Sequence, residues 1–243
     1  MIFLYPNMMF EKTVGTEFLE EMIEAENMGN VVCTTKDARV KSVHPQKTLF
    51  RGWMKTEDEY TKMYENLSSN GFMLINTPEQ YCNTHYINKW YSALYKTTFK
   101  TWLFDNEEHA LSFIEASGKM YVVKDAVKFG GVASSADELK IVFASMKKYR
   151  GEIEGCISLR EYHELDQYSE RRFFVFNGKV FSNGDPIPCL VYDIVGLIDS
   201  NFYSVDVITD VYGKDWIVEI GDGQVSGLKK WNVNTFYEMF KND

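Results

Sequence analysis

The chain of 243 residues has only 5 prolines and 4 cysteines, and neither residue type forms a recognisable pattern. No two cysteines stand in a C-x-x-C arrangement, so the sequence predicts neither a zinc site nor a disulfide framework. Reduced thiols are typical of a cytoplasmic protein. No apolar run approaches the roughly 18 residues of a membrane helix. The apolar opening, Met1–Phe10, lacks a basic region and a cleavage site, which favours a first strand over a signal peptide.

Positive charge is in deficit as well: 26 Lys and Arg stand against 35 Asp and Glu, a formal net charge of -9. Non-specific binding to nucleic acid depends on neutralising phosphates, so this balance argues against it but leaves room for a local basic cleft. The 4 histidines are scattered and pair with no nucleophile at a readable spacing. We interpret them as surface or structural residues.

The common nucleotide and hydrolase motifs are missing. There is no G-x-x-x-x-G-K-[ST] phosphate loop, no H-E-x-x-H and no G-x-S-x-G elbow. Gly221, Gly223 and Gly227 miss the dinucleotide-binding spacing by one residue and follow a strand late in the chain. Any phosphate-binding site must therefore be built differently.

The sequence does contain a clear alternation of strands and helices. Ile2–Tyr5, a helix over Thr16–Met28 and Val31–Thr34 predict a β-α-β opening. Four residues predict the apolar face of that helix, with Gly29 as its stop: Phe18, Leu19, Met22 and Ile23. Three capping boxes predict further helix starts: Thr56 with Glu59, Thr77 with Gln80, and Asp105 with Glu108.

The second half is mainly β apart from one helix capped by Ser135, whose Leu139, Val142, Phe143 and Met146 form an apolar face. Asn177-Gly178 between apolar runs predicts a hairpin. The expected strands are Met120–Val123, Cys156–Tyr162, Arg172–Phe176, Lys179–Phe181, Phe202–Thr209 and Trp216–Ile220, followed by a helix over Thr235–Phe240. The pattern predicts an α+β fold of two lobes with a cleft between them.

Two carboxylates, Asp206 and Glu219, each interrupt an apolar strand. A hairpin closed around Tyr212-Gly213 would set Asp210 opposite Asp215, Thr209 opposite Trp216, and Asp206 opposite Glu219. Opposed side chains lie about 5 Å apart, where two carboxylates repel unless a cation bridges them. Oxygen ligands in an incomplete shell favour Mg²⁺. The alternative is a register slipped by one, which turns one carboxylate to solvent.

Lys124 ends an apolar strand and precedes a small, glycine-containing segment, Lys128–Ser135. We expect that segment to be a flexible loop whose amides, with the helix N-terminus that follows, can close over phosphates. A partly buried ammonium requires an anionic partner, and phosphate is one candidate. The alternatives are an ion pair with Asp125 or a strand-end lysine that reaches water.

Arg160-Glu161-Tyr162 follows another apolar strand, and Arg171-Arg172 opens the next. The first group suits the border of an adenine site, or is a surface charge pair. Arginine suits bidentate phosphate contacts. The alternative for Arg171-Arg172 is a solvated charge cluster with Glu164, Asp166 and Glu170.

Taken in order, these segments resemble the ATP-grasp superfamily, in which two α+β lobes hold ATP between two sheets. Over Lys89–Leu228, Val122–Asp125 resembles the family strand whose lysine contacts phosphate, and Lys128–Ser135 resembles its mobile phosphate loop, here with Gly130 and Gly131. Ser158–Tyr162 resembles the hinge strand, and Arg172–Lys179 resembles the arginine-bearing strand and hairpin. The strands with Asp206 and Glu219 resemble the two metal-carboxylate strands.

A narrower resemblance is to a phage- and bacterium-associated branch marked by two arginines and a lysine, here Arg51, Lys124 and Arg172. The superfamily's Asn two residues after the glutamate is Gly221 here, and Asp222 is the expected substitute metal ligand. The earlier nucleotide lysine corresponds to Lys89. We expect a small α/β subdomain over residues 1–88 and an ATP-grasp core over 89–243.

The resemblance implies a ligase that uses ATP and Mg²⁺ to activate a carboxylate as an acylphosphate for attack by an amine. Arg51, Lys124 and Arg172 would be catalytic. Lys89, Lys124, Lys128, Gly130, Gly131, Arg160, Glu161, Tyr162 and Arg172 would bind nucleotide, and Asp206, Glu219 and Asp222 would bind metal. Two alternatives stay open: an ATP-dependent RNA end ligase and a non-catalytic nucleotide-binding protein. No motif identifies the acceptor.

Overall fold

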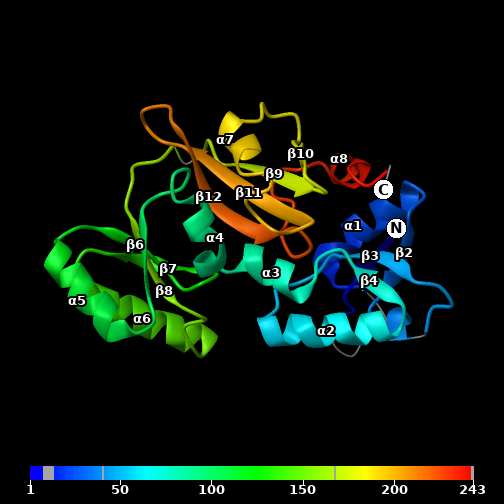
Figure 1. Cartoon of the computed structure of the whole chain (residues 1–243), viewed down its shortest axis with the longest axis horizontal. Coiled ribbons are helices and arrows are strands. Elements are labelled where there is room, and N and C mark those ends of the chain that lie inside the picture. Colours follow the sequence, from blue (N-terminus) through cyan, green and yellow to red (C-terminus); the bar gives the residue numbers. More distant parts are fainter. Residues whose placement is uncertain (8–13, 40, 167, 242–243) are drawn as a thin grey trace. The chain divides into compact units, whose positions relative to one another are not determined.

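The computed structural model describes residues 1–7, 14–39, 41–166 and 168–241 (Figure 1). Its residues group into two compact units. Unit 1 contains residues 1–83, 172–205 and 221–243, and unit 2 contains 84–171 and 206–220. The expected sequence boundary at residue 88 stays a prediction, because grouping by contact does not test it.

Unit 1 begins with a parallel sheet in the order β2-β1-β3-β4. Its strands are β1 (Ile2–Tyr5), β2 (Val31–Thr34), β3 (Gln46–Phe50) and β4 (Phe72–Leu74), connected through α1 (Thr16–Asn27), the 3-10 turn η1 (Asp37–Arg39) and α2 (Glu57–Ser69). The predicted β-α-β opening is confirmed. No pattern predicted β3, whose end delivers Arg51.

The predicted apolar face of α1 is only half right. Leu19 and Ile23 are 42% and 48% exposed. Phe18 and Met22 pack on the core, and Glu21 and Ala25 complete the buried face. The helix is rotated from the apolar pattern because the Glu21 carboxylate points inward, where it binds Arg51.

A second sheet has the order β10-β9-β11-β12, with β9 (Arg171–Phe176), β10 (Lys179–Phe181), β11 (Phe202–Thr209) and β12 (Asp215–Asp222). Asn177 and Gly178 have φ of 48° and 74°, which confirms the predicted two-residue hairpin. In unit 1, aromatic side chains from this sheet and from α8 (Val233–Glu238) share one core with β1: Phe174, Phe176, Phe202, Phe236 and Tyr237. A short helix, α7 (Cys189–Asp193), precedes β11.

Unit 2 contains an antiparallel sheet in the order β5-β8-β6-β7. Its strands are β5 (Thr101–Phe104), β6 (Tyr121–Lys124), β7 (Phe129–Ala133) and β8 (Ile157–Glu161). Helices α5 (Glu107–Ser117) and α6 (Ala136–Arg150) contribute to its core, and α6 does so through the predicted Leu139, Val142, Phe143 and Met146. Helices α3 (Pro78–His85) and α4 (Ile87–Leu94) precede the sheet.

The predicted flexible loop over Lys128–Ser135 is wrong, because most of this segment is β7, which pairs antiparallel with β6. Its glycines permit close packing of α6. A Cβ built on Gly130 would lie 2.5 Å from Met146 Sδ, and one on Gly131 would lie 3.0 Å from Val142 Cγ2. The glycines therefore have a packing role, and their contact with nucleotide stays a prediction.

Two of the three predicted capping boxes are confirmed, at Thr56–Glu59 and Thr77–Gln80. The third is wrong by one residue: Asn106, not Asp105, caps α5 by accepting from the amide of His109. Ser135 caps α6 as predicted. Among the described residues, no helix is long and apolar enough to cross a membrane. The expected α+β architecture is confirmed, with one parallel and two antiparallel sheets.

Candidate nucleotide site

A cavity of about 240 Å³ in unit 2 brings together four predicted site residues, Lys124, Arg160, Glu161 and Glu219. They come from β6, β8 and β12. Apolar and aromatic side chains form the rest of the lining: Phe99, Val122, Phe129, Leu165 and Val218, with His163 beside them. An apolar cavity with a few convergent charged groups is the usual construction of a small-ligand site.

Lys124 and Glu219 form an ion pair in this cavity. Lys124 Nζ donates to Glu219 Oε1 at 3.0 Å, and the two side chains are 10% and 40% exposed. The alternative partner, Asp125, instead accepts with Oδ1 from the amides of Val127 and Lys128 in the β6–β7 turn. The pair thus places a buried lysine donor beside a carboxylate that is partly exposed to solvent.

Arg160 is the most buried cation of the cavity, at 3% exposed. Its Nε donates to Thr101 Oγ1 at 3.3 Å and its Nη1 to the carbonyl of Val218 at 2.5 Å. Nη2, also buried, has no hydrogen-bond partner within the described part of the chain. Burial lowers the pKa of Arg160 to about 10 although the Glu219 carboxylate opposes this, so the guanidinium stays charged at neutral pH.

The other predicted nucleotide residues of unit 2 lie nearer the surface. Glu161 pairs with Lys119 at 3.5 Å, and Tyr162 is 45% exposed. Lys128 is exposed at the start of β7. Lys89 is exposed on α4, whose buried residues are Ile87, Trp90 and Leu94.

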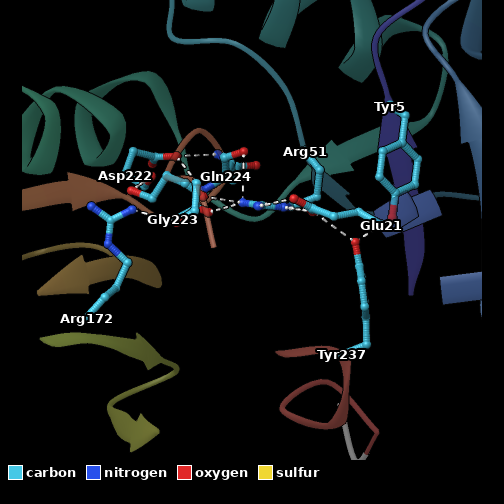
Figure 2. Close-up of polar contacts among 10 residues, drawn as sticks. Tyr5, Glu21, Arg51, Arg172, Asp222, Gly223, Gln224 and Tyr237 are labelled. Carbon is cyan, nitrogen blue, oxygen red and sulfur yellow. Dashed lines mark hydrogen bonds and ion pairs between the residues drawn. The ribbon is translucent and has the colours of Figure 1, made fainter. Parts of the chain in front are cut away.

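Arg51, in unit 1, has its guanidinium held on two sides (Figure 2). Nε and Nη2 bind both oxygens of Glu21 at 2.9 and 3.1 Å, and Nη1 donates to the carbonyls of Gly223 and Ser226 at 2.7 and 2.9 Å. Burial alone would lower the pKa of Arg51, but the Glu21 carboxylate outweighs it and the pKa is raised. Arg51 thereby fixes the turn that follows β12.

Glu21 was missed from the sequence, although a signal was present. It lies between Phe18 and Ala25 at helical spacing, where a charged residue indicates a buried partner. Tyr237 also donates to Glu21 Oε2 at 3.3 Å, and its hydroxyl lies 2.5 Å from that of Tyr5 (Figure 2). Arg172, the other marker arginine in unit 1, donates from Nη1 to the carbonyl of Gly227 at 2.6 Å.

Asp222 is fully buried in unit 1. Its Oδ2 accepts from Asn76 Nδ2 at 2.6 Å and its Oδ1 from the amide of Gln224 at 2.9 Å. Burial raises the pKa of Asp222 to about 7, against the opposing effect of these hydrogen bonds. Its role as a metal ligand stays a prediction, and its contacts give it a structural task.

The hairpin between β11 and β12 closes around Tyr212-Gly213, but the predicted register at the turn is wrong by one residue. The amide of Asp210 donates to the carbonyl of Lys214, and Thr209 Oγ1 lies 2.7 Å from Asp215 Oδ1. Gly213 at φ 84° permits the tight turn. Asp206, buried at 1%, lies in unit 2 with Glu219. Their opposition across the hairpin stays a prediction.

The donor set fits a hard cation that takes most of its ligands from elsewhere. Among the residues that the structure describes, no three His, Cys, Asp or Glu side chains cluster as a metal site. Asp206 and Glu219 are carboxylates of the kind that Mg²⁺ accepts when phosphates and water complete its shell, and their joint role as ligands stays a prediction. The site does not suit zinc, which requires more protein ligands.

No known family's sequence model and no curated protein sequence matches this chain. Solved structures do. The RimK domain protein ATP-grasp from Sphaerobacter thermophilus superposes with a TM-score of 0.65 at 14% identity over 98% of both chains. The D-cycloserine synthetase DcsG gives 0.69 at 12% identity over 98% of both chains. D-alanyl-alanine synthetase A from Vibrio cholerae gives 0.61 at 9% identity over 92% of this chain and 89% of its own. The resemblance in fold is confirmed, and the narrower branch stays a prediction.

Proposed function

Because the chain has the ATP-grasp fold, we propose that it is an ATP- and Mg²⁺-dependent ligase that activates a carboxylate for attack by an amine. The observation that carries this proposal is the unit 2 cavity, where Lys124 lies 3.0 Å from Glu219 beside Arg160 and Glu161. The sequence predicts a nucleotide or metal contact for each of these residues. Their convergence on one cavity supports a common ligand.

Each of these side chains has a task in phosphoryl transfer. Lys124 donates to phosphate oxygens, and Glu161 accepts from the nucleoside. The role of Arg172, which belongs to unit 1, stays the prediction made from the sequence. Asp206 and Glu219 would hold Mg²⁺, which would supply neutralisation of charge on the phosphates. Positioning and charge neutralisation account for most of the catalysis in such reactions.

The proposed reaction has two balanced steps. A carboxylate oxygen of the substrate attacks the γ-phosphorus, the bond from that phosphorus to the β–γ bridging oxygen breaks, and ADP leaves. An amine then attacks the acyl carbon, the acyl–oxygen bond breaks with release of phosphate, and the amine loses a proton. Lys124 Nζ, which donates to Glu219 in the structure, would donate to phosphate oxygens when nucleotide is bound, and Glu219 would then be available as a metal ligand.

Arg51 is proposed to act on the acceptor side by positioning. Arg51 donates to the carbonyls of Gly223 and Ser226 and so fixes the turn between them. Ser226 and the next residue, Gly227, line a second cavity of about 550 Å³ in unit 1. Glu17, Trp53 and Trp231 also line this cavity. The related ligase PsnB was solved with a precursor peptide, and peptides therefore belong among the acceptors to be tried.

The test is calorimetric titration of the purified protein with ATP, with and without Mg²⁺, beside Lys124→Ala. We expect Mg²⁺-dependent binding that the substitution weakens by at least about tenfold, since a charge-assisted contact contributes ~1.5–3 kcal/mol. Lys140→Ala is the matched control, because Lys140 is exposed on α6, pairs with Asp137 one helical turn away and does not line the cavity. No binding by folded wild-type protein would overturn the proposal.

The product of turnover separates the remaining alternatives. ADP released with phosphate in the presence of an acceptor supports the acylphosphate route. AMP released with RNA ends would favour end joining. Binding without turnover across carboxylate, amine and peptide acceptors would favour a non-catalytic nucleotide-binding protein.

A further inference from the structure

Arg160 has one side-chain donor without a hydrogen-bond partner among the residues that the structure describes. The side chain is buried, Nε and Nη1 bind Thr101 and Val218, and Nη2 is buried without a partner in the described part of the chain. A buried donor without an acceptor is destabilising, and more so when the group is charged. Because Arg160 also lines the unit 2 cavity, a ligand is the natural source of the missing acceptor.

The surroundings of Arg160 suit a flat ring better than a phosphate. Val122 is its direct neighbour on β6, and its guanidinium carbon lies 5.9 Å from the centre of the Trp90 ring. Phe99, Leu165 and Val218 line the same cavity. Apolar and aromatic walls stabilise a stacked base, whereas phosphate requires several donors.

The register of the sheet separates Arg160 from the charged end of the cavity. Lys124 is paired with Ser158, while Arg160 is paired with Val122, which lies two residues before Lys124 on β6. At ~3.3 Å per residue, the two cations enter the cavity about 7 Å apart along the strand. If Lys124 binds phosphate, as proposed above, Arg160 lies where the nucleoside begins.

We propose that Arg160 reads the nucleobase: Nη2 donates a hydrogen bond to an acceptor atom of the base and so determines which nucleotides the cavity accepts. A guanidinium has no acceptor. It can therefore bind a ring nitrogen or a carbonyl oxygen but cannot accept from an exocyclic amino group. This inference rests on the proposed nucleotide site and assigns it a specificity-determining residue.

The test replaces single acceptor atoms of the ligand. Binding of ADP with Mg²⁺ is compared with that of three analogues, in which N1, N3 or N7 of the purine becomes C–H, and with inosine diphosphate, whose carbonyl replaces the amino group. In wild-type protein we expect one of the three C–H analogues to bind about tenfold more weakly than ADP, the loss of one charge-assisted hydrogen bond. In Arg160→Met that difference should disappear.

Arg171→Met is the matched control, because Arg171 belongs to the same unit but pairs with Asp215 and does not line the cavity. It should discriminate among the analogues like wild type. Equal binding of ADP and all three C–H analogues by wild type overturns the inference, and this comparison requires no variant that folds. The inference is also overturned if Arg160→Met still binds that analogue about tenfold more weakly than ADP. This holds even where the variant binds ADP and all the analogues more weakly than wild type does. No binding of ADP or ATP at all is the different failure that overturns the ligase proposal as well.

Discussion

At the scale of single residues, the strongest structural prediction concerns Arg51. Arg51→Met leaves the Glu21 carboxylate buried without its partner and removes the donors to Gly223 and Ser226. Breaking a buried ion pair from one side costs ~3–5 kcal/mol. We expect the free energy of unfolding, measured by urea denaturation, to fall by about that amount.

The matched substitution Arg39→Met removes an exposed arginine and should change stability by no more than ~0.5 kcal/mol. Glu21→Gln combined with Arg51→Met should cost less than the sum of the single changes, because the second change removes a charge already left unpaired. Strict additivity would show that the pair observed in the structure does not couple the two residues.

His85 gives a second residue-scale prediction, on pH. Burial, and secondarily the charge of Lys128, lowers its pKa from 6.5 to about 4. Between these values the unfolded chain binds a proton that the folded chain does not, so the free energy of unfolding falls as pH falls through this window, by up to about 3 kcal/mol. His85→Gln should flatten the fall seen in urea denaturation from pH 7 to 4. His44→Gln, on an exposed histidine, should leave it unchanged; equal slopes in wild type and His85→Gln would contradict this account.

At the scale of elements, β7 depends on its glycines. Ala at position 130 places a Cβ 2.5 Å from Met146 Sδ, so α6 and β7 must separate or Met146 must move. Overpacking of this kind costs ~1–3 kcal/mol. We expect Gly130→Ala to lower the thermal midpoint, and to lower it less in a Met146→Ala background, where the clash with Sδ is absent. Ala at Gly227, where a Cβ meets nothing within 4 Å, is the control; equal effects at both positions would rule out the steric explanation.

Some of these elements and site residues could be predicted from the sequence and others could not. Lys124 and Glu219 could be found because a charge inside an apolar strand is a local signal, and both line the cavity. The strand β7 could not, because glycine pairs read locally as a loop and only packing against α6 selects extended structure. The cap at Asn106 was misassigned because Asp105 beside it is an equally good capping residue. The position of Glu21 on the apolar face of its helix is a local signal of burial, but its partner Arg51, 30 residues away, is fixed only by the fold.

At the scale of the whole molecule, unit 2 is assembled from two separate stretches of sequence, 84–171 and 206–220. The short stretch supplies contacts that the long one lacks. Ile217 exchanges backbone and side-chain hydrogen bonds with Thr97 and Thr98, at 2.9 and 2.7 Å, and the carbonyl of Val218 accepts from Arg160. Trp216 stacks on Phe99 at 5.1 Å. Without residues 206–220, Arg160 loses another partner while its charge stays in an apolar setting, a costly arrangement.

We therefore expect residues 84–171 alone to lack fixed tertiary packing, and the same residues joined to 206–220 through a flexible Gly/Ser linker to fold. The dispersion of amide resonances and the near-ultraviolet circular dichroism would distinguish the two, because both report ordered side chains rather than helix content. A linked segment with the order of residues 206–220 scrambled controls for chain length and composition. Cooperative unfolding of 84–171 alone, at the midpoint of the linked form, would mean that the hairpin is dispensable. The part of the cavity that contains Lys124 and Arg160 would then fold without Glu219. The proposed mechanism requires Glu219 in that cavity as a metal ligand.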